Sequence, residues 1–338
     1  MKSRILKLLE YMGPTTGAEL ARRLGTTRQS VNYHLKSLVS SGKVRKTGRT
    51  RGTRYSIPKK AGGPEKRTCS RTFHVEKEDE EEVFVYVSAC LDLSRRVNLN
   101  VSDIFHYALT EMVNNVIDHS MADKGRVTAS IGPYSCSFSV RDRGIGAFES
   151  IRRSHGLHDL EMAALEILKG KKTSAPGEHT GEGIFFTRQC ADSFTLAANG
   201  IQVHFENSGS TIERVRRTRG TLVEFEISRS SSRTLPRVFS EYAPESFDYT
   251  FSRTVVHLRL YSDTLQSRSL ARRVTAGVSD FREVVLDFEG VRSVGQGFAD
   301  EIFRVFSASH PDVKLVTKNI DPVLRPMIRH VTKEGRAD

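Results

Sequence analysis

The positive charge of this chain is concentrated at its N-terminal end, and this constrains the fold more than any other feature. Residues 1–60 contain fifteen Lys or Arg side chains and two Glu, whereas the whole chain of 338 residues holds 52 basic and 40 acidic side chains. The other 278 residues are therefore about neutral, with 37 basic and 38 acidic side chains. A basic domain joined to a neutral body indicates a polyanionic partner, nucleic acid first. The alternative is a basic surface that serves solubility alone.

The length allows two or three domains, each large enough to bury its own core. No apolar run approaches the roughly 20 residues that a membrane-spanning helix needs, and the first residues, MKSRILKLLEYMG, lack the apolar stretch of a signal peptide. Four cysteines, at positions 69, 90, 136 and 190, form no CxxC pair. This argues against a zinc cluster or a disulfide scaffold and suits a reducing compartment. We therefore expect a cytoplasmic protein that does not enter the membrane.

The first sixty residues have the pattern of a folded domain. Apolar residues recur at helical spacing in the first twelve positions, and TTGAELARRLG predicts a second helix between a threonine cap and Gly25. A third helix is predicted in TTRQSVNYHLKSLVSSG, where Val31, Leu35 and Leu38 form the apolar face. The segment KVRKTGRTRGTRYSI then predicts two short, arginine-rich strands. This order predicts a winged helix-turn-helix over residues 1–58.

This segment resembles bacterial winged-helix regulators, in which the third helix enters the major groove and the wing follows the DNA backbone. The resemblance implies double-stranded DNA as a partner. Base edges would be contacted from the third helix by Arg28, Gln29, Asn32 and Tyr33. Phosphates would be contacted from the wing by Arg45, Lys46, Arg49, Arg51 and Arg54. A winged helix can also bind protein, which is the alternative for this domain.

Residues 59–74 are predicted to be a linker, because PKKAGGPEKRTCS combines prolines, glycines and charges. The acidic run EKEDEEE at 76–82 then predicts the solvated start of a helix, where negative charge suits the helix dipole. We place a second domain at residues 75–232 and a third at 245–335.

The most informative stretch of the second domain is TEMVNNVIDHS, residues 110–120. With Glu111 at zero and about 100° per residue, Asp118, Asn115 and His119 fall at roughly −20°, 40° and 80°, whereas Asn114 falls at roughly 300° and points away. The first four side chains form a narrow polar stripe beside the apolar face of the helix. Such a stripe at the edge of a core is typical of a cleft, although Glu–Asn pairs also occur on many surface helices.

Three segments with glycines follow this helix in order: RDRGIGAF, HTGEGIFF and RGTLVEFEI. The first has an aspartate, Asp142, at a strand end. The second leads into an apolar helix, whose first amides can bind phosphate, and the third enters a strand. The residues where the backbone can approach a ligand are Gly144, Gly146, Gly181, Gly183, Gly220 and Thr221.

Together these segments resemble the GHKL ATPase superfamily and, within it, the anti-sigma-factor serine kinases. The motif E-x-x-x-N-x-x-x-H matches Glu111, Asn115 and His119, and the motif D-x-G-x-G begins at Asp142. The resemblance implies the α/β sandwich known as the Bergerat fold, with ATP and Mg²⁺ as cofactors.

The resemblance also implies a role for each position. Glu111 would orient or deprotonate the nucleophile, Asn115 would hold Mg²⁺, and Asp142 would accept a hydrogen bond from the adenine amino group. The other residues expected around ATP are Asp118, His119, Gly144, Gly146, Lys172, Thr180, Gly181, Gly183, Ile184 and Thr221. Residues 147–180 would form a lid over the nucleotide. His119 could instead pack or cap.

The last hundred residues alternate strand and helix, which predicts an α/β domain with parallel strands. The run VVLDFEGVRSVGQGFADEIF resembles the STAS domains of anti-anti-sigma factors, in a STAS-like variant found fused to such ATPases. Gln296 and Gly297 stand where that family has its phosphorylated serine, and Ser293 lies nearby but out of register. The expected role is a built-in docking partner for the ATPase domain. The whole chain is thus expected to be a multidomain α/β protein: winged helix, GHKL sandwich, then STAS-like domain.

Three functions fit these patterns. The first is a DNA-binding transcriptional regulator in which the nucleotide site gates the winged helix. The second is an ATPase or serine/threonine protein kinase acting on a separate partner. The third is a STAS-mediated interaction protein with a degenerate nucleotide site, which the presence of Glu111 and Asn115 disfavours. A homodimer is expected, because winged-helix regulators often read paired half-sites and GHKL kinases often pair.

Overall fold

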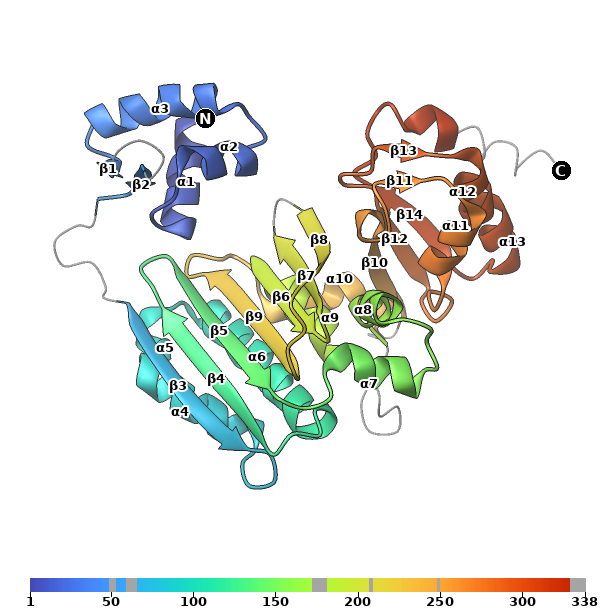
Figure 1. The fold of residues 1–338 in the computed structure, drawn as a ribbon, viewed down its shortest axis with the longest axis horizontal. Helices are drawn as coiled ribbons and strands as arrows, with labels where there is room; N and C mark the ends of the chain where they lie inside the picture. Colours follow the sequence, from blue (N-terminus) through green and yellow to red (C-terminus); the bar gives the residue numbers. More distant parts are fainter. Residues whose placement is uncertain (49–52, 59–65, 172–180, 207–208, 248–249, 329–338) are drawn as a thin grey trace.

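The computed structural model describes residues 1–48, 53–58, 66–171, 181–206, 209–247 and 250–328. Three bodies follow one another along the chain (Figure 1): a small helical domain, a middle domain built on a large sheet, and a C-terminal α/β domain. Four residues of the predicted sites lie outside the described residues, namely Arg49, Arg51, Lys172 and Thr180.

The N-terminal domain consists of three helices and a hairpin. Its elements are α1 (Lys2–Met12), α2 (Gly17–Arg23), α3 (Arg28–Ser40), β1 (Arg45–Thr47) and β2 (Arg54–Ser56). The hydroxyl oxygens of Thr16 and Thr27 accept hydrogen bonds from backbone amides in the first turns of α2 and α3, which satisfies amides that the helix itself leaves unpaired. The two strands pair antiparallel. This is the arrangement of a winged helix-turn-helix.

The middle domain is built on a seven-stranded antiparallel sheet with the strand order β3-β4-β5-β9-β6-β7-β8. The strands are β3 (Arg67–His74), β4 (Lys124–Ile131), β5 (Ser135–Asp142), β6 (Ser193–Ala198), β7 (Ile201–Glu206), β8 (Gly209–Arg214) and β9 (Thr221–Ser228). Buried residues alternate with more accessible ones along β4 and β5. One face of the sheet is therefore covered, and the other carries polar side chains.

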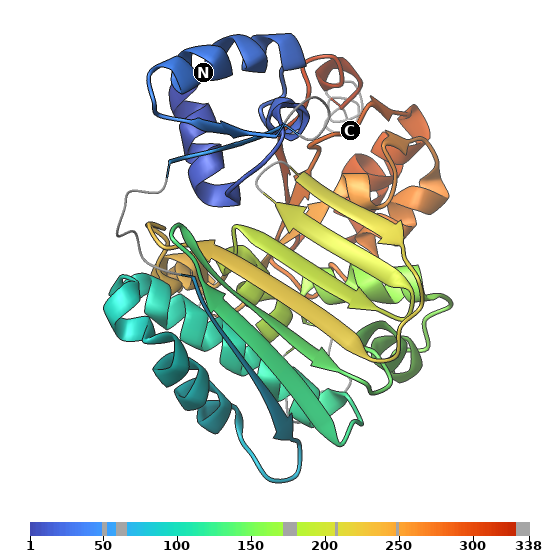
Figure 2. The same ribbon diagram turned by 60° about the vertical axis from the view of Figure 1, so that its left-hand side comes forward.

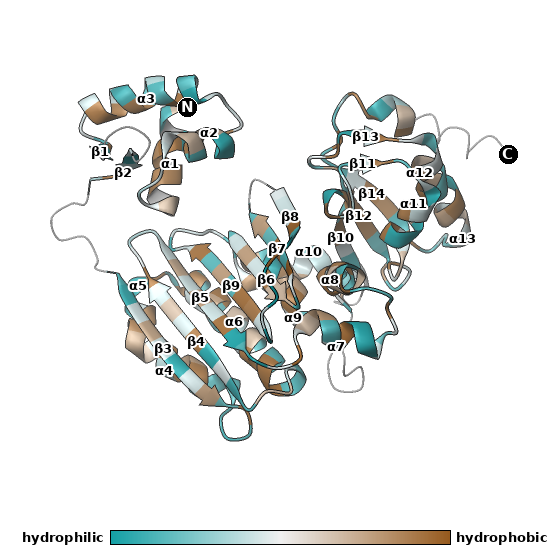
Figure 3. Cartoon of the chain, viewed as in Figure 1, coloured by the Kyte–Doolittle hydropathy of each residue, from teal (hydrophilic) through white to brown (hydrophobic). Residues whose placement is uncertain are grey.

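Helices cover one face of this sheet (Figures 1 and 2). α6 (Leu99–His119) packs between α4 (Glu80–Leu91) and α9 (Gly183–Cys190), and Figure 3 shows hydrophobic residues along this layer. The remaining helices are α5 (Leu93–Arg96), α7 (Ala147–Ser154), α8 (Leu160–Lys169) and α10 (Leu235–Tyr242). None of the helices in the described part of the chain, including the 21-residue α6, has the length and hydropathy that a membrane crossing requires.

The edge strand β3 lies where the sequence predicts the end of a linker. The predicted linker spans residues 59–74, but Arg67–His74 pair with β4 over eight residues. Cys69 and Phe73 are buried, and a Cβ on Gly125 would lie 2.2 Å from Cζ of Phe73. The Phe73 ring therefore fills the space that a side chain at 125 would take. Because two of the eight strand residues are buried, the alternation that identifies a strand is too weak to be recognised.

The C-terminal domain confirms the predicted parallel pairing. β10 (Arg253–His257), β12 (Glu283–Asp287) and β14 (Lys314–Lys318) form a parallel sheet, and β11 (Thr264–Leu265) pairs in parallel with β13 (Ser293–Val294). The connecting helices are α11 (Arg268–Thr275), α12 (Gln296–Asp300) and α13 (Ser307–Ser309). A π-helical segment at Glu301–Phe306 joins the last two. Short 3₁₀ turns lie at Glu245–Phe247 and Leu258–Leu260.

Two hydrophobic cores lie within the described residues. One is confined to the N-terminal domain and includes Ile5, Leu20 and Leu35. The other is a single cluster that extends from Cys69 in β3 to Ile328 near the end of the described chain. The middle and C-terminal domains therefore share one core, whereas the winged helix has its own.

Candidate functional site

A cavity of about 320 Å³ lies in the middle domain where α6 meets β5, β9 and the start of α9, with α7 and α8 closing its side. Nine of the residues predicted to surround ATP line it: Glu111, Asn115, Asp118, His119, Asp142, Gly181, Gly183, Ile184 and Thr221. The fold thus brings segments from residue 111 to residue 221 to one cavity. Apolar side chains from several elements complete the wall, among them Met112, Val140, Ile151, Ile167 and Leu196.

The polar stripe of α6 faces this cavity along its whole predicted width. Asn114 also lines the cavity, although the sequence predicts that it points away. Met112 and Val116, at roughly 100° and 140°, line it as well, so the cavity covers the helix from roughly 300° through 0° to 140°, an arc of about 200°. Isolated angles predict the centre of such an arc well but not its edge, because the edge depends on how far the neighbouring segments stand from the helix.

Asp142 ends β5 and is almost completely buried, with 3 % of its surface exposed. Its Oδ1 accepts a hydrogen bond of 2.8 Å from the Gly144 amide, and both carboxylate oxygens lie 3.2 Å from the Thr221 amide nitrogen. Burial raises the pKa of Asp142, while these hydrogen bonds act in the opposite direction. The carboxylate is therefore held in one orientation at the cavity wall.

Gly144 and Gly146 lie beside the cavity, and neither is among its lining residues. A Cβ on Gly144 would lie 1.7 Å from the Ser120 carbonyl oxygen, and a Cβ on Gly146, at φ +88°, would lie 2.5 Å from Oδ1 of Asn199. The two glycines thus allow the loop after β5 to press against the end of α6 and the β6–β7 turn. Their contacts in the structure are with the protein itself, and their predicted place beside ATP stays a prediction.

Two side chains that the sequence did not single out hold this loop. The Asn199 amide donates to the Ile145 carbonyl at 2.9 Å and accepts from the Glu149 amide at 3.1 Å. The Thr221 hydroxyl accepts from the Ala147 amide at 3.0 Å. Asn199 precedes Gly200 in the turn between β6 and β7, and its own φ is +54°. The Asn-Gly pair predicts a hairpin turn, but nothing local indicates that its side chain reaches a loop fifty residues away.

Glu111 lies against the first residue of α9. A Cβ on Gly183 would be 2.1 Å from Oε2 of Glu111, so a side chain at 183 would displace the carboxylate from the helix start. Burial raises the pKa of Tyr107, one turn before Glu111, and the Glu111 carboxylate adds to this shift. Glu182, between the two glycines, also lines the cavity, and burial raises its pKa.

The charge of the described cavity lining is negative. It includes the carboxylates Glu111, Asp118, Asp142 and Glu182 and no lysine or arginine. An anionic ligand would therefore need a cation beside it. Among the described residues, no group of three or more His, Cys, Asp or Glu side chains is arranged to hold a metal. A hard cation such as Mg²⁺, which takes oxygen ligands and keeps waters, fits a site where the Asn115 amide and the ligand itself supply the donors.

The candidate DNA-binding surface is the outer side of α3 together with the hairpin. Arg28, Gln29 and Tyr33 are exposed on α3, and Tyr33 keeps 73 % of its surface accessible. Arg45 and Lys46 are exposed on β1. These five residues form an accessible polar and basic surface, as predicted.

Two other residues of the predicted DNA surface also contact their own domain. Asn32 is half-buried towards α2, where a Cβ on Gly17 would lie 2.9 Å from its Oδ1. Arg54 donates a hydrogen bond of 3.1 Å to the Pro14 carbonyl. Asn32 thus packs between two helices of its own domain, and Arg54 holds the hairpin to the turn before α2. Both side chains thus have contacts within the domain, and the base and phosphate contacts predicted for them stay predictions.

In the C-terminal domain, the loop that replaces the usual serine pair begins α12 at Gln296. Ser293 lies in β13, and its hydroxyl accepts a hydrogen bond of 2.9 Å from the Gln266 amide. Gly295 lies close to the same residue, since a Cβ there would be 2.6 Å from Oε1 of Gln266. Ser293 is therefore part of the β11–β13 pairing.

Comparisons with known proteins support the two end domains. Residues 1–54 match the MarR family, and residues 270–324 match a STAS-like domain of unknown function. The predicted winged helix and STAS-like domain are thereby confirmed, and the first match indicates a DNA-binding transcriptional regulator. Residues 55–269, which carry the cavity, lie outside both matched segments. The GHKL resemblance of the middle domain stays a prediction.

No curated protein matches the sequence significantly. Among solved structures, the IcIR transcriptional regulator from Alicyclobacillus acidocaldarius is 15 % identical, with 73 % of this chain and 96 % of that chain covered and a TM-score of 0.19. At this TM-score the likeness carries no argument about the fold.

Proposed function

We propose that the protein is a transcriptional regulator that binds DNA through its winged helix and Mg²⁺·ATP in the cavity of its middle domain. The nucleotide part rests on one observation: Glu111, Asn115, Asp142 and Gly183 meet at a single cavity. Those residues belong to the ordered motifs by which the sequence resembles GHKL ATPases. An antiparallel sheet covered by helices on one face also agrees with the sandwich that this resemblance implies.

Asp142 would select the base. Its carboxylate is oriented by the amides of Gly144 and Thr221 and can accept a hydrogen bond from the amino group of adenine. Guanine presents a carbonyl oxygen at the corresponding position, and that oxygen would face the carboxylate without a proton between them. The apolar wall beside Asp142, including Val140 and Leu196, suits a flat aromatic ring.

The phosphates would lie towards the start of α9. The backbone amides from Gly181 to Ile184 line this end of the cavity, and amides at a helix start favour bound anions. Because carboxylates also line this end, Mg²⁺ would be needed between them and the phosphates, with Asn115 as a ligand. When bound, the ion would supply charge neutralisation. Glu111 would orient or deprotonate the attacking hydroxyl or water.

The nucleotide proposal is tested by calorimetric titration of the purified chain with ATP and with GTP, each with Mg²⁺ or with excess chelator. We expect binding of ATP that requires Mg²⁺, weaker binding of GTP, and no binding by Asp142→Asn. Asp123→Asn is the matched control, because Asp123 is exposed outside the cavity. Equal ATP affinity of Asp142→Asn and the wild type would refute the assignment of the base site.

The fate of the terminal phosphate distinguishes a switch from an enzyme. Incubation with γ-labelled ATP gives retained ATP for a binding switch, free phosphate for an ATPase, and labelled protein for a kinase. In the two enzymatic cases, Glu111→Ala should bind ATP like the wild type but stop turnover. Normal turnover by this variant would mean that Glu111 is not the catalytic residue.

The DNA part of the proposal rests on the exposed basic surface of the MarR-type domain. Removing residues 1–60 should abolish salt-sensitive binding to duplex DNA. In the full chain, Arg28→Ala should weaken binding and reduce its sequence preference, whereas Lys46→Ala should weaken binding to all sequences alike. Arg292→Ala, an exposed arginine of the C-terminal domain, is the charge-matched control. Unchanged binding after removal of residues 1–60 would exclude the winged helix as the DNA-binding element.

Gating and assembly complete the proposal. We expect the affinity for DNA to differ between the ATP-bound and ATP-free protein, and we expect a homodimer on DNA with paired half-sites. Electrophoretic mobility shifts with and without Mg²⁺·ATP measure the first, and light scattering measures the second. We also expect a partner protein to bind through the STAS-like domain. Turnover of labelled ATP, measured with and without that partner, tests this expectation.

A further inference from the structure

Two helices of the middle domain extend from the cavity to the C-terminal domain. α8 carries Ile167 in the cavity wall and Lys169 two residues later, and α9 carries Gly183 and Ile184 in the wall and Arg188 one turn later. Lys169 and Arg188 are both buried charged residues, with 2 % and 6 % of their surfaces exposed. Buried charges are costly unless they are paired, so what they contact identifies a specific interface.

Lys169 is held by groups from both domains. Its Nζ pairs with Glu166 in the same helix at 2.6 Å and donates to the Ala276 carbonyl, which follows α11, at 2.6 Å. In the other direction, the hydroxyl of Thr254 in β10 donates to the Lys169 carbonyl at 2.6 Å. Thr254 is fully buried. The end of α8 is thus tied to the C-terminal domain through both its side chain and its backbone.

Arg188 ties α9 to the same domain. Its Nη1 lies 2.8 Å from Nε2 of His257 at the end of β10, and the other ring nitrogen of His257 lies 3.3 Å from the Asp287 carboxylate in β12. The guanidinium also lies 4.7 Å from the ring centre of Phe205. Burial lowers the pKa of Arg188 to about 10. Arg188 can only donate to Nε2 of His257 if that histidine is neutral. Nε2 is then the acceptor, and the Nδ1–H group is directed at Asp287.

An aromatic cluster packs between the contacts of Lys169 and those of Arg188. The Phe251 ring, just before β10, lies 4.7 Å from that of Phe185 and 5.1 Å from that of Phe186, both in α9, and 5.2 Å from that of Phe281. At the end of α8, Gly170 has φ +81° and leaves room for Phe251, since a Cβ there would be 2.6 Å from the ring. The interface is therefore closely packed as well as hydrogen-bonded.

We propose that the C-terminal domain positions the wall of the cavity, with Lys169 and Arg188 as the positioning residues. Lys169 lies two residues after Ile167 in α8, and Arg188 lies about one helical turn after Ile184 in α9. The contacts that hold Lys169 and Arg188 therefore also hold the parts of these helices that form the cavity wall. Loosening the interface allows α8 and α9 to shift, and with them Ile167 and the Gly183–Ile184 amides. By reciprocity, a ligand that holds the wall in place also strengthens the docking of the C-terminal domain.

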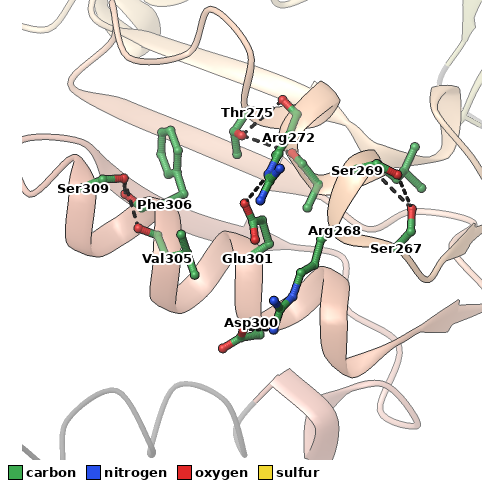
Figure 4. Close-up of polar contacts among 12 residues, drawn as sticks. Ser267, Arg268, Ser269, Arg272, Thr275, Asp300, Glu301, Val305, Phe306 and Ser309 are labelled. Atoms are coloured by element: carbon green, nitrogen blue, oxygen red, sulfur yellow. Dashed lines mark hydrogen bonds and ion pairs between the residues drawn. The ribbon is translucent and has the colours of Figure 1, made fainter.

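The test uses full-length variants changed on the C-terminal side of the interface. Thr254→Val removes the hydrogen bond to the Lys169 carbonyl with almost no change in shape, and His257→Leu removes the acceptor for Arg188. His257→Gln retains an acceptor and is the rescue variant. Glu301→Gln is the matched control: Figure 4 shows Arg272 directed at Glu301, a pair at 2.7 Å that joins α11 to the π-helical segment inside the C-terminal domain.

The first readout needs no ligand. Amide hydrogen exchange should rise about tenfold at residues 164–168 of α8 and 186–190 of α9 in the double variant Thr254→Val/His257→Leu, within the usual range of coupling between sites. It should return towards the wild-type rate with His257→Gln and stay unchanged in Glu301→Gln. If the double variant does not fold, Thr254→Val alone should still raise exchange at residues 164–168 of α8, whose end it holds. Faster exchange at β10 with no change at α8 and α9 would overturn the proposal.

The second readout rests on the proposed nucleotide site. The affinity for Mg²⁺·ATP should fall about tenfold in the double variant and stay at the wild-type value in Glu301→Gln. Equal affinity in the double variant and the wild type would contradict the coupling. A wild-type protein that binds no nucleotide would instead refute the proposed function, and the exchange measurement would still decide whether the C-terminal domain holds the cavity wall.

Discussion

The two ends of the chain are joined to the middle domain in opposite ways. The winged helix has a core of its own, and an ion pair between Arg23 in α2 and Glu206 in β7 joins it to the sheet, with one hydrogen bond of 2.7 Å. The C-terminal domain shares a continuous core with the middle domain and adds the buried contacts of Lys169 and Arg188.

This difference has a direct energetic meaning. A partly exposed ion pair contributes about 1 kcal/mol or less, whereas each fully buried phenylalanine contributes about 1.5–3 kcal/mol. Phe185, Phe186 and Phe251 meet at the C-terminal junction. The middle and C-terminal domains should therefore unfold together, and the winged helix should behave as a separate unit.

The largest expected effect comes from breaking the shared core. Phe251→Ala should lower the free energy of unfolding by about 3–5 kcal/mol, because it leaves a cavity between the two domains. The middle and C-terminal domains should both be destabilised, in one transition, as followed by urea unfolding combined with hydrogen exchange. Leu35→Ala in the winged-helix core is the counterpart and should lower the stability of residues 1–58 alone. Two separate transitions for the middle and C-terminal domains in Phe251→Ala would show that the shared core does not make them cooperative.

Acid should affect the two junctions differently. Burial lowers the pKa of His257, and the neighbouring Arg188 and Lys318 act in the same direction, while Asp287 opposes them. The folded protein therefore takes up the proton less readily than the unfolded chain, whose histidine has a pKa of about 6.5. The contribution of His257 to the C-terminal junction is complete above about pH 6.5 and is lost as the pH falls towards its lower folded value.

The winged-helix junction should persist over the same pH range. Burial alone would raise the pKa of Glu206, but its hydrogen bond from His204 and the charge of Arg23 lower that pKa to about 2, from 4.5. This contribution is therefore present above about pH 4.5 and is lost only as the pH approaches about 2. Limited proteolysis at pH 7.5 and pH 5.5 should show the C-terminal junction opening first, and His257→Gln should remove that change. If protease cleaved both junctions equally at pH 5.5, protonation of His257 would not be what opens the C-terminal junction.

The smallest effect is expected from the winged-helix junction itself. Glu206→Gln should change the stability of either neighbouring core by about 1 kcal/mol or less and should release the winged helix, measurable as an increase in the radius of gyration by small-angle scattering. Salt at molar concentration should act on the wild type in the same direction, because it screens the pair. Glu213→Gln, on the neighbouring strand β8, is the charge-matched control. A large loss of thermal stability in Glu206→Gln would mean that the winged helix is more closely joined than its contacts indicate.

Local patterns in the sequence are sufficient to predict several parts of the fold. Val31, Leu35 and Leu38 predict α3 because one helix face is apolar, and the alternation after residue 250 predicts the parallel strands. The polar stripe of α6 predicts four residues that line the cavity. In each case the information lies within one element, where periodicity reports which side is buried.

Other features depend on contacts between distant segments and have no local signal. The sequence predicts a linker at Arg67–His74, because the burial of β3 depends on its contacts with Gly125 and α4. Asn199 holds a loop fifty residues earlier, and Arg54 donates to a turn forty residues earlier. In the sequence, Lys169 and Arg188 look like ordinary charged residues at the ends of helices. They are buried because they contact the C-terminal domain, whose first strand begins more than sixty residues after either of them. Such roles are set by tertiary packing alone.

The weak contact at Arg23 gains importance because the winged helix cannot diffuse away. Seven residues, 59–65, connect Pro58 to Lys66, and a short tether keeps the local concentration of its two ends in the millimolar range. A change of about 1 kcal/mol in the free energy of docking, the size of one such ion pair, then changes the ratio of docked to released protein about fivefold. A DNA site or ligand that favours one form by a similar amount changes that ratio by a similar factor.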